Sequence, residues 1–73
     1  MGELLNELRE LDLSGNYLEQ ITTAIYFLRN LEILNYSDNN LYEIPDWIYH
    51  CNSIKKLILR KNVINHIDDM YGN

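Results

Sequence analysis

The residues best suited to chemistry in this sequence are the adjacent pair His50 and Cys51, together with His66 and the acidic pair Asp68 and Asp69. A cysteine and a histidine can act as nucleophile and base, and a zinc site needs three or four nitrogen or sulfur ligands. The sequence offers three such ligands, without the spacing of a zinc finger. Adjacent residues on a helical turn do not face a common partner, which argues against a His50–Cys51 pair.

Other chemical motifs are absent from the sequence. It has no glycine-rich phosphate-binding loop, no dinucleotide-binding glycine pattern and no nucleophile elbow. The pair Asp68–Asp69 is better interpreted as a solvated acidic segment than as a cation site, and Asn35-Tyr36-Ser37 is a weak glycosylation sequon because it falls within an expected strand. We therefore expect no catalytic, cofactor-binding or metal-binding site, and no enzymatic activity.

Charge and cysteine usage narrow the function classes further. The 73 residues include 6 Lys and Arg against 11 Asp and Glu, a net charge of -5, which argues against a dedicated nucleic-acid binder. No apolar run approaches the ~20 residues that a membrane helix needs, so we expect no membrane contact. The single Cys51 excludes an internal disulfide, and Met1-Gly2-Glu3 does not begin a signal peptide. These features predict a cytoplasmic protein.

When the sequence is aligned with itself at a shift of 23 residues, the apolar positions coincide in three successive copies. The aligned triplets are Leu8, Leu31 and Ile54; Leu11, Leu34 and Leu57; Leu13, Tyr36 and Leu59; Leu18, Leu41 and Ile64; and Ile21, Ile44 and Ile67. A fixed period of about 20 to 50 residues is typical of a solenoid. Alternation within each copy predicts three short strands, and their recurrence in one direction predicts a parallel sheet.

The segments between the strands carry a second set of repeated features. An asparagine follows each strand, at Asn16, Asn39 and Asn62, and its amide can pair with backbone groups that the turn leaves free. We expect these residues to stack as an asparagine ladder inside the solenoid. The return segments 22–30 and 45–53 are too short for long helices, so they predict short helical or 3₁₀ turns with Cys51 as a small core residue.

The three segments 8–21, 31–44 and 54–67 follow the pattern L-x-x-L-x-L-x-x-N-x-L-x-x-I, with Tyr36, Ile54 and Ile64 as the replacements. This pattern resembles the leucine-rich repeat family over essentially the whole chain. The resemblance implies a single α/β solenoid over residues 1–73, with a short parallel sheet on its concave face and 3₁₀ or irregular return segments. It also implies a non-catalytic module that binds a protein partner and needs no cofactor.

In such a sheet, the residues between the core positions point to the concave face. Ile33 and Ile58 are apolar there, and they are diagonal neighbours on adjacent strands. The expected partner-binding residues are Ile33, Asn35, Asp38, Lys56, Ile58, Arg60 and Lys61. Four of the basic residues fall within positions 55–61, and this asymmetry either steers an acidic partner or balances like charges across the strands.

The ends of the solenoid suggest an alternative function. Each repeat buries its apolar side against its neighbours, and terminal units normally need polar caps, which neither end of this sequence shows. The chain would then be a structural subunit or a fragment of a larger solenoid, held through its ends by contact with another chain. Trp47 and Tyr49 on one return segment, and Tyr26 and Phe27 on the other, either cover the repeat edge or pack against a neighbouring subunit.

Overall fold

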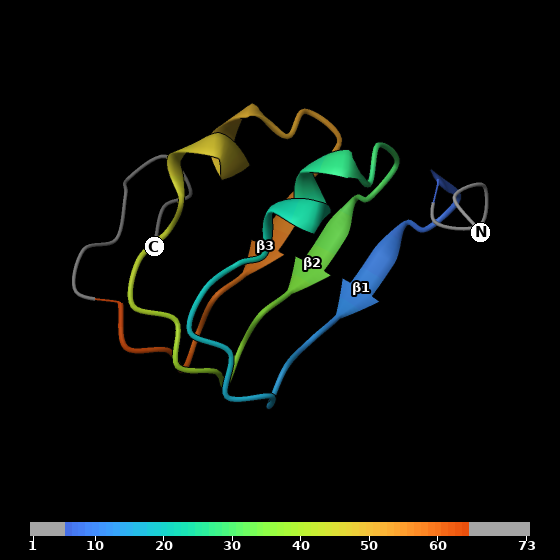
Figure 1. Ribbon diagram of the computed structural model, residues 1–73. Helices are drawn as coiled ribbons and strands as arrows, with labels where there is room; N and C mark the ends of the chain where they lie inside the picture. The colour runs from blue at the N-terminus through green and yellow to red at the C-terminus, as the bar shows by residue number, and fades with distance from the viewer. Residues whose placement is uncertain (1–5, 65–73) are drawn as a thin grey trace.

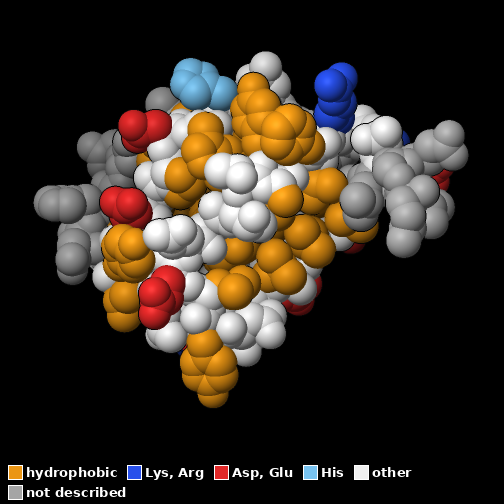
Figure 2. All heavy atoms as spheres, in the orientation of Figure 1, with side chains coloured by type: hydrophobic (Ala, Val, Ile, Leu, Met, Phe, Trp, Pro, Cys, Tyr) orange, Lys and Arg blue, Asp and Glu red, His pale blue; other side chains and the backbone are white. Residues whose placement is uncertain are grey.

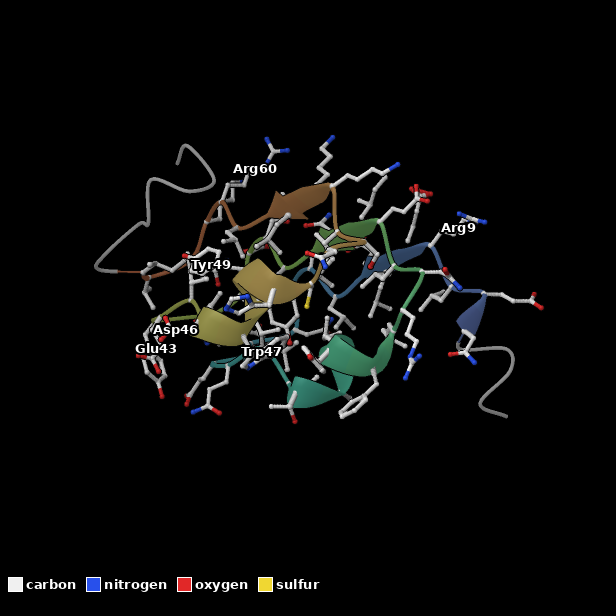
Figure 3. All side chains as sticks on the ribbon, turned by 90° about the horizontal axis from the view of Figure 1, so that it is seen from above. Arg9, Glu43, Asp46, Trp47, Tyr49 and Arg60 are labelled. Atoms are coloured by element: carbon white, nitrogen blue, oxygen red, sulfur yellow. The ribbon has the colours of Figure 1, made fainter. Side chains whose placement is uncertain are left out.

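Short strands and single 3₁₀ turns alternate along residues 6–64, the part of the chain that the computed structural model describes (Figure 1). The elements are β1 (Glu10–Asp12), η1 (Thr23–Phe27), β2 (Ile33–Asn35), η2 (Asp46–His50) and β3 (Lys56–Ile58). The strands form one parallel sheet in the order β1-β2-β3, and η1 and η2 lie side by side across the core from it (Figures 1 and 3). This arrangement confirms the predicted fold class.

The 23-residue period is also the register of the sheet. Glu10 pairs with Ile33, and Ile33 pairs with Lys56, so each strand is offset from the next by one whole repeat. Backbone pairing continues past the strand ends, where Leu13 N donates to Asn35 O at 2.8 Å and Tyr36 N donates to Ile58 O at 2.8 Å. Equivalent residues of successive repeats are therefore lateral neighbours, and the sequence period translates directly into spatial order.

Complete burial is concentrated in the middle repeat, residues 31–53. Its apolar side chains Leu31, Leu34, Leu41 and Ile48 are fully buried, each at 0% exposure. The equivalents of the three leucines in the first and third repeats are only half-buried; in order of position they are Leu8, Leu11 and Leu18, then Ile54, Leu57 and Ile64. Because only the middle repeat has a described neighbour on both sides, it gains the full benefit of about 1.5 to 3 kcal/mol per buried side chain.

The two return segments turn back over the core by the same local means. Each 3₁₀ helix buries one isoleucine, Ile25 in η1 and Ile48 in η2. The side chain of Thr22 caps η1 by accepting a hydrogen bond from Ala24 N, whereas Pro45, with its φ at -68°, directly precedes η2 and makes no side-chain cap. Each 3₁₀ helix is only five residues long, because the return segment has to cross only the thickness of one repeat.

The amide of Asn39 joins two repeats and is nearly buried, at 6% exposure. Its Nδ2 donates to Leu13 O of the first repeat and to Tyr36 O of its own repeat, both at 3.0 Å. Its Oδ1 accepts from Asn16 N and Leu18 N of the first repeat, both at 2.9 Å. A single side chain thus pairs both backbone donors and acceptors at the turn that follows each strand.

The same pattern recurs one repeat further along the chain. Asn62 Nδ2 donates to Tyr36 O and Leu59 O, both at 2.9 Å, and its Oδ1 accepts from Leu41 N at 2.8 Å. Asn16, in contrast, is exposed, and within residues 6–64 its Nδ2 donates only to Leu13 O and Ser14 O of its own turn. The bonds therefore have a direction, because Asn39 and Asn62 each reach back to the repeat that precedes them.

Tyr36 replaces a leucine in the repeat pattern and adds a second polar link between repeats. Its ring is buried, at 1% exposure, and its hydroxyl donates to Gln20 O at 3.1 Å. Burial raises the pKa of Tyr36 above the ordinary value of 10.0, and a backbone hydrogen bond with Thr22 only partly offsets this shift. The side chain crosses the core from the sheet and reaches the chain just before η1.

We expect Asn39→Ala to lower the free energy of unfolding by about 3 kcal/mol, because it leaves several buried backbone groups of two repeats unpaired. The matched variant Asn16→Ala removes bonds within one exposed turn and should cost less than about 1 kcal/mol. Urea unfolding followed by circular dichroism measures both values. Equal losses in the two variants would show that the bonds between repeats do not stabilise the fold.

Alkaline pH should destabilise the wild type through Tyr36. Below pH 10 both the folded and the unfolded chain keep this proton, so stability is constant; above it, the unfolded chain releases the proton first and stability falls as the pH rises through the folded pKa. Tyr36→Phe should lose about 1 kcal/mol at neutral pH and show a flatter alkaline profile. Thermal melts from pH 8 to 11, with the exposed Tyr17→Phe as control, test this. A wild-type slope that persists in Tyr36→Phe would contradict the assignment.

Candidate functional site

The concave face of the sheet presents every second strand residue away from the core. On β1 these are Glu10 and Asp12, and both are exposed. On β2, Ile33 and Asn35 are half-buried, flanking the fully buried Leu34. The face thus changes from acidic on β1 to neutral on β2, as the sequence pattern predicts.

The third strand adds an apolar residue and a set of cations. Lys56 is exposed and Ile58 is half-buried, and Arg60 and Lys61 follow the strand as exposed residues. Because Ile33 pairs with Lys56 in the register, Ile58 lies two residues further along the neighbouring strand. The two isoleucines are therefore diagonal neighbours, a spacing within reach of one contacting group. Both keep part of their surface open to solvent.

Lys56 of β3, and Arg60 and Lys61 after it, have no carboxylate partner within residues 6–64. The ion pair found there joins Arg9 Nη1 to Glu32 Oε2 at 2.8 Å, one repeat apart at the start of β1 and β2. Lys55 is the equivalent residue of the third repeat, 23 residues after Glu32. Figure 3 shows Arg9 and Arg60 on the sheet side, far from each other. Exposed pairs of this kind contribute only about 0 to 1 kcal/mol, so the charge pattern matters more for recognition than for stability.

Two polar residues of the concave face bend back onto their own turns. Asp12 Oδ1 accepts from Ser14 N at 2.9 Å and Ser14 Oγ at 2.6 Å, and these bonds lower the pKa of Asp12. Asn35 Oδ1 accepts from Ser37 N at 3.0 Å and Ser37 Oγ at 2.7 Å. Asn35 therefore offers a partner its NH₂ group rather than its oxygen. The acid or amide two residues before a serine, repeated at 23 residues, is a sequence signal that predicts this turn.

Two of the predicted partner-binding residues also carry backbone strain. Gly15, Asp38 and Lys61 occupy the same position of successive repeats, and all have a left-handed backbone, with φ of 72°, 57° and 60°. Glycine adopts this conformation freely and aspartate tolerates it, whereas lysine is strained there. Asp38 and Lys61 are thus exposed residues of the left-handed turn that borders the concave face.

The residues first considered for chemistry do not form a site within the described chain. His50 is exposed, whereas Cys51 is half-buried against the core and its burial raises the pKa of the thiol, which opposes a nucleophilic role. Among residues 6–64, no three His, Cys, Asp or Glu side chains converge as metal ligands. His66, Asp68 and Asp69 lie outside the described residues. The same part of the chain contains no helix with the length and apolarity to span a bilayer.

A cluster of aromatic side chains covers the return segments, opposite the concave face. The ring of Tyr26 meets those of Phe27 and Trp47 edge to face, with centroids 5.4 Å and 6.2 Å apart. Tyr26 and Phe27 remain 51% and 66% exposed, and a hollow of about 360 Å³ lies beside them. Figure 3 shows Trp47 on the side opposite Arg60. The rings lie on the outer edges of η1 and η2, and packing of a neighbouring subunit against them stays a prediction.

The N-terminal side of the first repeat is hollow and apolar. A cavity of about 580 Å³ opens between β1 and η1. It is lined by Asn6, Leu8, Leu11, Leu13, Thr22, Ala24, Ile25, Phe27 and Leu28. Figure 2 shows hydrophobic side chains across the middle of this face. The lining of the hollow combines half-buried leucines of the first repeat with the buried Ile25 and the exposed Phe27, on the side where no described strand covers them.

Comparison with known proteins agrees with this architecture. The model of the leucine rich repeat family matches residues 6–64, and the chain belongs to that family. Domains of this family generally mediate protein–protein interactions and are generally non-enzymatic.

The volume-regulated anion channel subunit LRRC8E of Xenopus laevis is 36% identical over 63 residues. That match covers 84% of this chain but only 8% of the frog protein. No solved structure matches the chain significantly.

The left-handed turn position allows opposite changes in stability to be predicted at two sites. A Cβ at Gly15 would meet no atom within 4 Å, so Gly15→Ala tests backbone strain alone and should cost about 1 kcal/mol. Lys61→Gly removes the strain and should stabilise the fold by up to about 1 kcal/mol. Paired thermal melts measure both. A loss of stability in Lys61→Gly would show that the lysine side chain makes a compensating contact.

Proposed function

We propose that the chain binds a protein partner on its concave face, through the residues predicted from the sequence. Ile33 and Ile58 form the apolar centre, Asn35 offers a hydrogen-bond donor, and Lys56 and Arg60 provide positive charge beside them. Asp38 and Lys61 border the site at the turns. Neither a cofactor nor a metal takes part in this function.

The observation that carries this proposal is the half-open isoleucine pair on adjacent strands, beside cations that lack a carboxylate partner in the described chain. Apolar groups ringed by polar ones are typical of the centre of a protein interface. The chain already balances Arg9 with Glu32, whereas Lys56, Arg60 and Lys61 remain available to an acidic surface. The preferred partner therefore presents an apolar side chain flanked by carboxylates.

We place this interaction in the cytoplasm as part of the proposal. The support is the single cysteine, Cys51, which is compatible with a reducing compartment. A partner with an acidic surface would be attracted over several ångströms at moderate salt, because exposed charges act within a Debye length of about 8 Å.

The double variant Ile33→Asp/Ile58→Asp should abolish partner binding, since it places two carboxylates at the apolar centre and repels an acidic partner. The wild type and the variant are used as baits in a native lysate, and proteins captured by the wild type are purified and titrated against both. Binding should weaken at least a hundredfold. Circular dichroism verifies that the variant is folded.

The matched control is Tyr26→Asp/Phe27→Asp, which adds the same charge to exposed residues of η1 on the opposite side. It should bind the captured protein as the wild type does. If binding is lost in this control and kept in the isoleucine variant, the working surface is the aromatic edge and the concave-face assignment is wrong.

A second candidate function is structural, as a subunit held in a larger assembly through the ends of the solenoid. The apolar hollow beside β1 favours it, since such a surface gains stability when covered. The similar frog protein is named as a channel subunit, so a chain with this kind of repeat occurs in an assembly. This function would use the faces of the first and third repeats rather than the concave face.

A further inference from the structure

The first and third repeats expose matching apolar faces. Leu11 and Leu13 of the first repeat are half-buried, and so are Leu57 and Leu59 of the third, whereas the equivalent Leu34 and Tyr36 between them are buried. Within residues 6–64, each half-buried set has a neighbouring repeat on one side, whereas the middle repeat has one on both sides. Either set would be covered by a further parallel strand that pairs with β1 or β3 in the same 23-residue register.

The hydrogen bonds of the asparagine side chains leave complementary groups at the two ends of the described residues. Leu18 N and Leu41 N each donate to the asparagine Oδ1 of the following repeat. Their counterpart in the third repeat is Ile64 N, which finds no such acceptor within residues 6–64. At the other end, the Oδ1 of exposed Asn16 accepts no bond from the described chain. Within residues 6–64, one end therefore presents an unpaired donor and the other an unpaired acceptor for the same interaction.

The charges on the two edge strands are also complementary. β1 carries Glu10 and Asp12, and β3 with its following turn carries Lys56 and Arg60, all exposed. If a third-repeat strand lay beside β1 in the 23-residue register, Lys56 would face Glu10, and Arg60 would lie diagonal to Asp12. Opposite charges at such positions stabilise strand pairing.

The register also brings unfavourable neighbours together, among them the apolar Ile58 beside the Asp12 carboxylate. Lys55 would lie beside Arg9, but Arg9 already pairs with Glu32. The neighbouring carboxylate reduces the repulsion between the two cations.

We propose that the chain self-associates head to tail, with the β3 edge of one copy pairing in parallel with the β1 edge of a second copy. The proposal rests on the second candidate function, a subunit held through the ends of the solenoid, and its partner is a second copy of the chain. Asn16 of one copy would accept from Ile64 N of the next, which continues the asparagine ladder across the contact. The contact is heterologous and each copy keeps one free edge, so association is open-ended and depends on concentration.

Sedimentation equilibrium of the purified chain tests the proposal without any other protein. The average mass of the wild type should rise with concentration from the micromolar to the millimolar range. Glu10→Lys and Lys56→Glu each place like charges across the contact and should reduce the association constant at least tenfold. The double variant Glu10→Lys/Lys56→Glu restores an opposite pair and has the wild-type net charge, so it should regain association.

Glu43→Lys is the matched control, because it makes the same charge change as Glu10→Lys at an exposed site on neither edge strand. Its association should equal that of the wild type. A wild type that remains monomeric throughout, single variants that associate like the wild type, or a double variant that fails to recover would each overturn the head-to-tail contact. Because Glu10 is not among the concave-face residues and no partner is present, such a failure leaves the protein-binding proposal to its own test.

Discussion

The bonds of Asn39 to two successive turns are the constraint on which the rest of this structure depends. A parallel solenoid must turn its chain at the end of every strand, and each turn leaves backbone groups that no strand can pair. One carboxamide has both a donor and an acceptor side, so it can serve both kinds of group at once. Its position at a constant distance from the strand holds the register, and the register in turn stacks Leu11, Leu34 and Leu57 into one core.

Most of the fold could be predicted because the period is uninterrupted. With no insertion in three copies, alignment at 23 residues identified the strands, the core positions and the turn asparagines, and the sheet has that register. The length of the return segments predicted short helical or 3₁₀ turns, and η1 and η2 take the 3₁₀ form. The family resemblance and the fold class are confirmed, because both depend on residues that repeat.

The features that escaped prediction are those in which the repeats differ. Tyr36 aligned with leucines, and nothing in the pattern indicated that its hydroxyl would cross the core to Gln20. The left-handed turn at Asp38 and Lys61 is visible only by analogy with Gly15, since neither residue signals it alone. The degree of burial of Ile33 and Ile58 depends on neighbouring side chains, which the repeat pattern does not determine. The concave-face binding site stays a prediction. The same limit applies to the apolar hollow beside β1.

The equivalence of successive repeats has a consequence for how such a chain can change during evolution. A duplication or loss of one 23-residue unit preserves every lateral pairing, because the new neighbour presents the same backbone groups as the old one. An insertion of one residue within a strand would instead reverse the inward and outward positions after it. Besides the exchange of one apolar core residue for another, as at Tyr36, two kinds of sequence change fit this architecture. Substitution at outward positions alters what is recognised, and gain or loss of a whole repeat alters the length of the array.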